Sequence, residues 1–293
     1  MSAGPAGGFD LRIWGCGGSV PVGRADRLRF GGDTTCFELR RLGPDAVPLI
    51  VDLGSGARDL GAALAAEASA EGRTVRAEVV FSHFHLDHVV GMPFFAPLYD
   101  PTAEVTLRAG LVPDGRALSE VLGALAAPPL FPVRPLETGA ARFEIFRPGE
   151  PFAAAGFEVT PLACTHPGGA FGFRIACPAG VVCVIGDHEH GVPKVDEGLA
   201  EAVAGADLMI YDATYETADY EAHRGWGHST WQVGLALAEA AGVRRTLFHH
   251  HPPEMDDDAL EARDADVRAA SNGAGLARQG MRLRIGGGEI AEL

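Results

Sequence analysis

Residue types that bind metal ions are concentrated in one short segment, Ser82-His83-Phe84-His85-Leu86-Asp87-His88, where three imidazoles and one carboxylate lie within six positions. Neutral imidazoles combined with a carboxylate are the ligands that zinc and its neighbouring transition metals prefer. A solvated turn that is merely rich in histidine is the alternative. The whole ligand set in so short a segment favours a metal site.

Three further candidate ligands stand just beyond the ends of predicted apolar strands. The first cluster follows a strand predicted for 77–81, and His166, Asp187 and His250 follow strands predicted for 158–163, 181–186 and 245–248. A single histidine in such a place is more often structural, but three such residues predict one shared site at a sheet edge. His249 and His251 flank His250 and are alternative ligands, although alternation along the strand points them away from it.

The elements around these residues come as runs of strands with helices between them. Strands are predicted at 11–14 and 35–39 around a glycine-rich loop (15–19), at 48–54, within 142–163 and at 207–211, and helices at 57–69 and 230–241, the latter ending at Gly242. This order predicts sheets that pack together and carry helices on their outer faces.

The ordered pattern His83-x-His85-x-Asp87-His88, His166, Asp187 and His250 resembles the ligand pattern of the metallo-β-lactamase superfamily. The resemblance covers nearly the whole chain and implies an α/β (α+β) fold, an αββα sandwich in one domain (1–293) with the metal site at one edge. It implies two divalent ions per chain: one held by His83, His85 and His166, the other by Asp87, His88 and His250, with Asp187 bridging. Asp52 would orient a ligand of the first cluster. These groups suit Zn²⁺, and Mn²⁺ or Fe²⁺ would bind them as well.

Within the superfamily the chain looks most like tRNase Z and the small phosphodiesterases related to it. The motifs that carry this are Tyr211-Asp212-Ala213-Thr214 and Gly227-His228-Ser229-Thr230. tRNase Z usually has Glu at the position of Asp212, paired with the histidine that matches His228. The resemblance implies that Asp212 holds His228, that His228 protonates the leaving oxygen, and that Asp87 orients a hydroxide bridging the ions. Ser229 is expected to be the N-cap of the following helix.

The tRNA-gripping arm of tRNase Z, which lies between the third His and the bridging Asp, is missing here. The interval 167–186 holds little beyond two strands, predicted at 171–176 and 181–186, and the net charge of −15 does not suit a nucleic-acid binder. We therefore expect a small phosphodiester substrate, such as a cyclic nucleotide or nucleotide derivative, and no stable nucleic-acid partner. A thioester hydrolase, a sulfur dioxygenase and a non-catalytic metal-binding regulatory module are the alternatives.

The composition is that of an ordinary globular enzyme: 293 residues, 47% hydrophobic and 22% charged. No segment approaches the roughly 18 apolar residues of a membrane span, and no secretory signal is recognisable. Five cysteines, an odd number without a Cys-x-x-Cys motif, suit reduced core positions. We expect a cytoplasmic protein without a membrane partner. Residues 114–125, predicted helical, and 131–133 could shape a small-molecule pocket, a homodimer contact or ordinary core.

Overall fold

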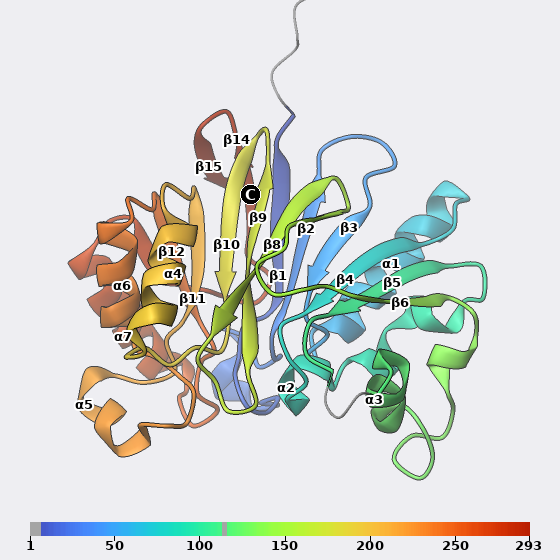
Figure 1. The fold of residues 1–293 in the computed structure, drawn as a ribbon, viewed down its shortest axis with the longest axis horizontal. Helices are drawn as coiled ribbons and strands as arrows, with labels where there is room; N and C mark the ends of the chain where they lie inside the picture. Colours follow the sequence, from blue (N-terminus) through green and yellow to red (C-terminus); the bar gives the residue numbers. More distant parts are fainter. Residues whose placement is uncertain (1–6, 113–115) are drawn as a thin grey trace, which may run out of the picture.

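Two β-sheets packed face to face form the centre of the computed structural model, which describes residues 7–112 and 116–293. Helices cover both outer faces: in Figure 1, α1 (Ala57–Glu71) and α3 (Leu118–Leu125) lie on one side, and α4 (Pro193–Val203), α6 (Trp231–Ala240) and α7 (Asp257–Ala270) on the other. The αββα sandwich expected from the sequence is confirmed. None of the described helices is both long and apolar enough to cross a membrane.

Each sheet combines antiparallel and parallel strands. In the described residues the first sheet has the order β15-β14-β1-β2-β3-β4-β5-β6, and the second has the order β13-β12-β11-β10-β9-β8-β7. The bounds in the first sheet are Phe9–Gly15 (β1), Cys36–Arg41 (β2), Pro48–Val51 (β3), Arg76–Phe81 (β4), Glu104–Ala109 (β5), Ala141–Ile145 (β6), Arg282–Gly286 (β14) and Glu289–Glu292 (β15). Those in the second are Phe152–Ala154 (β7), Phe157–Cys164 (β8), Ala170–Cys177 (β9), Gly180–Ile185 (β10), Leu208–Asp212 (β11), Arg245–His249 (β12) and Ala274–Leu276 (β13).

Parallel pairing brings the carboxyl ends of several strands to one edge of each sheet. Strands β3 to β6 are parallel to one another, as are β10 to β13, and β8 runs with β10 because both are antiparallel to β9. The carboxyl ends of parallel strands meet at one edge of a sheet, where side chains from several loops can converge. Two short helices follow such ends: α2 (Leu86–Val89) and α5 (Thr217–Tyr220).

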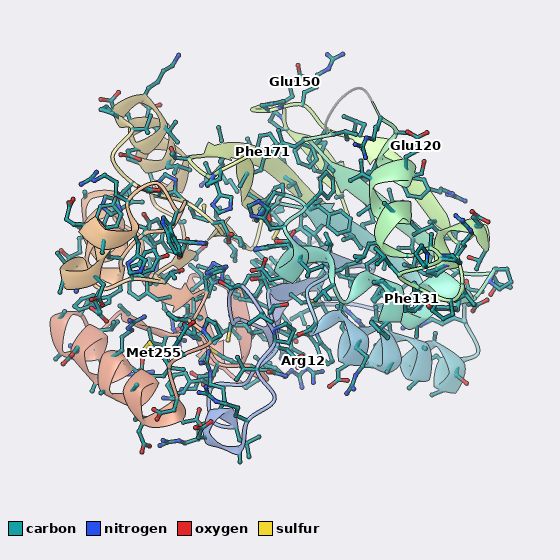
Figure 2. The ribbon with its side chains drawn as sticks, turned by 90° about the horizontal axis from the view of Figure 1, so that it is seen from below. Arg12, Glu120, Phe131, Glu150, Phe171 and Met255 are labelled. Atoms are coloured by element: carbon teal, nitrogen blue, oxygen red, sulfur yellow. The ribbon has the colours of Figure 1, made fainter. Side chains whose placement is uncertain are left out.

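The core lies in three apolar layers. Inward-facing residues of both sheets, such as Leu11, Phe37, Phe173 and Ile210, fill the space between the sheets. Separate clusters pack the first sheet against α1 and α3, and the second sheet against α4, α6 and α7. Figure 2 shows side chains filling the space between the ribbons, with Phe171 of the first of these layers labelled. Burial of both faces explains why the β10 and β11 sequences are continuous apolar runs.

Three differences from the sequence-based expectation concern the ends of elements. The strand predicted for 48–54 ends at Val51, because Asp52 has a positive φ of 62°. The N-cap of α6 is Thr230, whose side chain accepts a hydrogen bond from the Val233 N–H, and the expectation of Ser229 is wrong. The helix predicted for 114–125 begins at Leu118, and positions 114 and 115 lie outside the described residues.

Candidate metal centre

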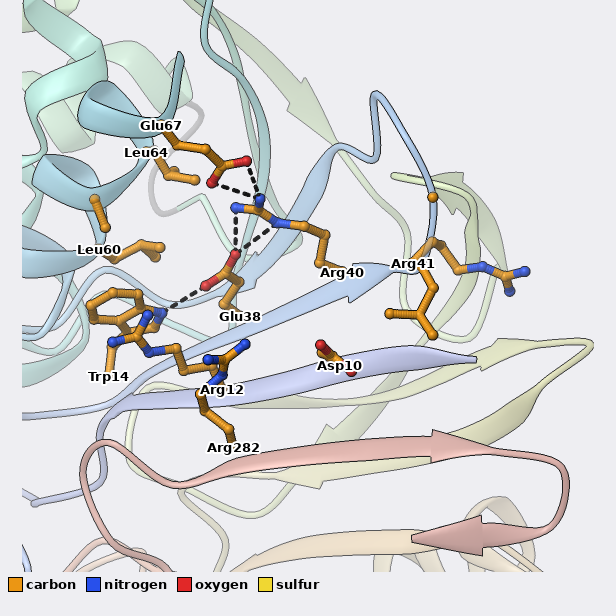
Figure 3. A pocket seen from close by; sticks show the side chains of 13 residues that line it. Asp10, Arg12, Trp14, Glu38, Arg40, Arg41, Leu60, Leu64, Glu67 and Arg282 are labelled. Carbon is orange, nitrogen blue, oxygen red and sulfur yellow. Dashed lines mark hydrogen bonds and ion pairs between the residues drawn. The ribbon is translucent and has the colours of Figure 1, made fainter. Parts of the chain in front are cut away.

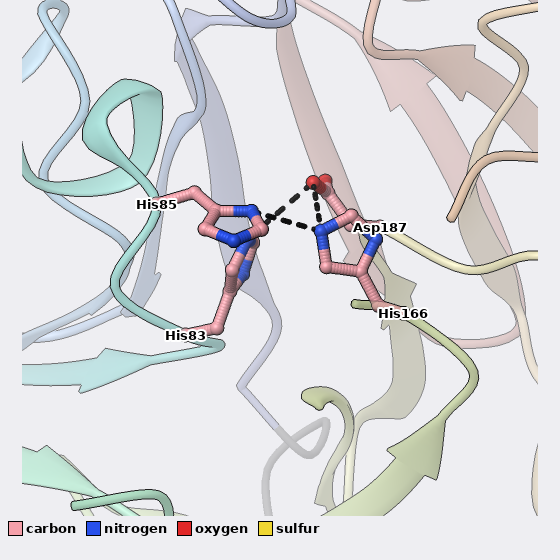
Figure 4. A group of neighbouring side chains, drawn as sticks. All are labelled: His83, His85, His166 and Asp187. Atoms are coloured by element: carbon pink, nitrogen blue, oxygen red, sulfur yellow. Dashed lines mark hydrogen bonds and ion pairs between the residues drawn. The ribbon is translucent and has the colours of Figure 1, made fainter. Parts of the chain in front are cut away.

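The first group of candidate ligands consists of His83, His85, His166 and Asp187, whose ligand atoms lie within 4.8 Å of one another. Figure 4 shows the imidazoles gathered around the Asp187 carboxylate. Nε2 of His83 and Nε2 of His166 each lie 3.5 Å from Oδ2 of Asp187. Nδ1 of His85 lies 2.9 Å from Nε2 of His166. These nitrogens therefore converge on one small volume.

A second group shares Asp187 with the first and adds Asp87, His88 and His250. Nε2 of His88 and Nε2 of His250 lie 3.2 and 3.4 Å from Oδ1 of Asp187. Nε2 of His250 is also 3.2 Å from Oδ2 of Asp87. Asp187 thus turns one carboxylate oxygen to each group and would be shared if both groups held an ion. All seven ligands predicted from the sequence lie together.

Hydrogen bonds behind the imidazoles fix which nitrogen faces the centre. Nδ1 of four histidines contacts a neighbour: His88 with Asp52 (2.8 Å), His83 with the Ser82 hydroxyl (3.0 Å), His166 with the Gly227 carbonyl (2.8 Å) and His250 with the Thr214 hydroxyl (2.8 Å). An Nδ1–H donated outward leaves the Nε2 lone pair free for a metal ion. Asp52 therefore orients His88, as the sequence predicted.

Two glycines allow the backbone to approach these rings. A Cβ at Gly18 would lie 2.3 Å from the His250 ring, and a Cβ at Gly227 would lie 2.2 Å from Nδ1 of His166. Gly227 also has a φ of 89°, which favours glycine. The loop after Gly18 then brings the Ser19 N–H within 2.8 Å of Oδ2 of Asp87.

Buried carboxylates and imidazoles shift one another's pKa values. Burial alone would lower the pKa of His250, but Asp187 and Asp87 outweigh it and raise that pKa to about 9. Burial would raise the pKa of Asp187, but His250, His88 and His83 hold it well below its usual range. The pKa of His83 is lowered by burial and by the neighbouring His88. Such strongly interacting groups are typical of functional sites.

The donor set fits divalent metal ions. Among the described residues, Nε2 of His83, Nε2 of His88 and Oδ1 of Asp187 are buried without a hydrogen-bond partner. Leaving buried polar atoms unpaired is costly, so these atoms need a partner of another kind. Imidazole nitrogens and carboxylate oxygens that point at one another across 3.2–3.5 Å provide suitable ligands for a shared cation.

The pair Asp212 and His228 lies beside the two groups. Nδ1 of His228 is 2.7 Å from Oδ2 of Asp212, and the His228 ring stacks on His250 at a centroid distance of 4.4 Å. These residues also form a third group with Asp187 and His250 that could hold an ion. Asp212 is already saturated, however: it accepts bonds from Thr214 and from the His188 N–H. The pair is therefore better suited to holding and moving a proton than to binding metal.

The other candidates near these ligands, His249, His251 and Cys164, make contacts outside the candidate centre. His249 is buried with its ring 5.3 Å from that of Phe37, and Nε2 of His251 donates to the Ala277 carbonyl. The five cysteines are free, as predicted. The Cys164 thiol contacts the Leu162 carbonyl, and burial raises its pKa to about 12. Neither flanking histidine nor Cys164 belongs to a candidate ligand group within the described residues.

Several supporting groups were not predicted from the sequence. These are the Ser19 N–H, the Gly227 carbonyl, the Thr214 hydroxyl and the Glu189 carboxylate, which accepts bonds from the Gly225 and Gly227 N–H groups. Thr214 lies in a motif already identified and could have been found there. A backbone donor or acceptor leaves no signal in residue type.

A cavity of about 310 Å³ opens beside the first group. His83 and His85 line it, together with the apolar side chains of Phe84, Leu111 and Pro167. Another cavity, of about 320 Å³, lies between α1 and the β1–β2 face of the first sheet, and no candidate ligand lines it (Figure 3). There Glu38 accepts from the Trp14 indole and forms an ion pair with Arg40.

Comparison with known proteins agrees with this geometry. A family model for the beta-lactamase superfamily domain matches residues 49–251. The uncharacterized protein ML1173 of Mycobacterium leprae (strain TN) is 29% identical over 279 residues, which cover 90% of this chain and 86% of that protein. Ribonuclease Z of Bradyrhizobium sp. (strain ORS 278) is 29% identical over 234 residues, covering 66% of this chain and 78% of that protein.

Solved structures share the fold. The metallo-beta-lactamase fold protein YhfI from Bacillus subtilis has a TM-score of 0.69 and 19% identity, covering 95% of this chain and 99% of that one. A diphosphatase from the PhnP family has a TM-score of 0.65 and 19% identity, covering 98% and 99%. The chain therefore belongs to the beta-lactamase superfamily, in a branch that resembles tRNase Z.

Proposed function

We propose that the protein is a metal-dependent phosphodiesterase that acts on a small phosphodiester. The observation that carries the proposal is the position of His228, which is held by Asp212 and stacked on the candidate ligand His250. A relative named ribonuclease Z and a structural neighbour described as a diphosphatase support chemistry at phosphorus. Thioester hydrolysis and sulfur oxidation do not call for the Asp212–His228 pair.

Two divalent ions fit the donor sets. One would be held by His83, His85, His166 and Asp187, and the other by Asp87, His88, Asp187 and His250. When bound, such ions supply Lewis-acid activation of water and neutralise charge on the phosphoryl oxygens.

The protein's own groups supply orientation and a proton. Asp212 accepts from Nδ1 of His228 and so leaves Nε2 of that ring to face the substrate, with its side chain 12% exposed. A histidine in this place can donate a proton to a leaving oxygen, which an alkoxide needs in order to depart. Asp87 is kept in position by the Ser19 N–H and can orient the attacking water.

A small substrate suits this surface better than RNA. Between His166 and Asp187 the structure has only β9, β10 and their turns, so no arm is inserted there. The net charge of −15 opposes binding of a long polyanion. We propose a cyclic nucleotide or another nucleotide derivative as the substrate class.

The test compares leaving groups in metal-loaded protein. His228→Ala should slow hydrolysis of an alkyl or nucleoside phosphodiester by about 10²–10⁴. It should slow bis-p-nitrophenyl phosphate much less, because a nitrophenolate leaves without a proton. Asp212→Asn should show the same selectivity more mildly, since the imidazole remains. Metal content measured in parallel should be unchanged.

Two results would count against the proposal. Equal slowing of both substrates by His228→Ala would mean that His228 binds phosphate or supports structure. Efficient thioester hydrolysis by wild-type protein, with no phosphodiester cleaved, would assign the protein to the alternative class.

A further inference from the structure

A tryptophan is exposed in the loop that carries His228. Trp226 is 62% exposed, although large aromatic side chains usually serve in cores or at binding surfaces. It lies two residues before His228, in the loop that follows α5. An exposed tryptophan at this point is available to a bound molecule.

The backbone on both sides of Trp226 is anchored. The buried Glu189 carboxylate accepts from the Gly225 N–H (2.7 Å) and from the Gly227 N–H (2.8 Å). The Trp226 N–H itself donates to the His223 carbonyl (3.0 Å). The side chain is therefore exposed on a fixed support, and stacking on it would cost little ordering of the loop.

The anchored loop also belongs to the candidate centre. The Gly227 carbonyl accepts from Nδ1 of His166, and the next residue is His228. The position of Trp226 is thus tied to a candidate ligand and to the candidate proton donor through one peptide segment.

Further rings connect Trp226 with His228. The Trp226 ring lies 5.1 Å from His223 and edge-on to it, and His223 stacks on Tyr215 at 4.4 Å. The Tyr215 ring is 6.0 Å from that of His228, and its N–H donates to the Ser229 carbonyl. These residues form a continuous aromatic wall on the His228 side of the centre.

We propose that Trp226, supported by His223 and Tyr215, is a stacking platform for the base of a nucleotide substrate whose phosphoryl group lies at the metal centre. The inference rests on the proposed phosphodiesterase function and adds to it a binding place for the base of the nucleotide. Stacking of a base on an aromatic side chain is sequence-tolerant, because every base presents a flat π-face. The platform would therefore accept several bases.

Binding calorimetry on the metal-loaded full chain tests the platform, with AMP and ribose 5-phosphate as probes. Wild-type protein should bind AMP about ten- to hundredfold more tightly than ribose 5-phosphate. Trp226→Ala should remove most of this preference, whereas Trp226→Phe should keep much of it. Leu111→Ala, in the apolar cavity beside His85, is the matched control and should leave the preference intact.

The competing location for the base gives the opposite pattern. If Leu111→Ala removes the preference and Trp226→Ala does not, the base lies in the apolar cavity and the platform is wrong. Equal affinity of wild-type protein for both probes would also overturn it. Failure to hydrolyse any phosphodiester would instead overturn the proposed function, while the difference between the two probes would still report on Trp226.

Discussion

The two candidate ion groups share Asp187 but differ in burial. In the group of Asp87, His88, Asp187 and His250, every side chain is buried. In the other group His85 is exposed, whereas the side chain of His166 is only 2% exposed. The apolar cavity adjoins this open side, and the Gly227 carbonyl, one residue after Trp226, accepts from Nδ1 of His166. From this difference we expect the buried group to hold an ion more tightly and the open group to face the substrate.

The groups also differ in how their ligands are held. Each unshared ligand of the buried group has a supporting bond, from the Ser19 N–H, Asp52 or Thr214. In the open group, the His85 side chain contacts His166, another candidate ligand, with Nδ1 of His85 2.9 Å from Nε2 of His166. Supporting bonds orient ligands and raise metal affinity, so the buried ion should also exchange more slowly.

Asp187→Ala should have the largest effect, because it removes the one residue common to both groups. We expect both ions and all hydrolytic activity to be lost, as measured by metal analysis after dialysis. Asp100→Ala, an exposed carboxylate outside both groups, serves as the control. Circular dichroism verifies that the variant is folded. A folded variant that keeps two ions and wild-type activity would refute the shared role of Asp187.

His85→Ala should impair metal binding at the open group only. Its loss removes an exposed candidate ligand from the open group and leaves the buried group complete, so metal analysis should find one ion per chain, where we expect two in the wild type. His223→Ala, a histidine outside both groups, should leave the metal content unchanged. Loss of both ions in His85→Ala would show that the groups do not bind independently.

The sequence predicted which residues gather at the candidate centre because these residues follow strand ends. Each stands just after an apolar strand or within one short segment, and such positions are brought together by parallel pairing. The Asp212–His228 contact was likewise predicted from two motifs. In both cases the side-chain type itself carries the information.

The supporting groups could not be predicted in the same way. Ser19 acts through its N–H and Gly227 through its carbonyl, which every residue type provides. The Ser229 prediction failed for a related reason. Its hydroxyl is already engaged by His190 and Tyr211, and Thr230 takes the N-cap. Contacts made between distant loops decided the outcome at these residues.

Asp52→Asn tests the support of the buried group. Asp52 accepts from Nδ1 of His88 and also binds the Ser82 N–H and hydroxyl. An amide holds the imidazole less strongly, and substitutions of this kind typically lower metal affinity by about 10–100-fold. Competition with a chelator should show the loss at the more slowly released ion. Loss confined to the rapidly released ion would mean that the buried group holds its ion less tightly than the open group does.

Thr214→Val should have the smallest effect, because it removes a single neutral support and nearly preserves the shape of the side chain. The Thr214 hydroxyl accepts from Nδ1 of His250 and donates to Oδ1 of Asp212. The valine variant therefore leaves His250 and Asp212 each without one hydrogen-bond partner. A neutral hydrogen bond contributes about 0.5–1.5 kcal/mol, which corresponds to a loss of roughly two- to tenfold in affinity for the buried ion. Thr214→Ser keeps the hydroxyl and should bind metal as the wild type does. If Thr214→Val instead releases the ion faster than Asp52→Asn, the hydroxyl supports the buried group more than the carboxylate does, and the ranking of supports would have to be inverted.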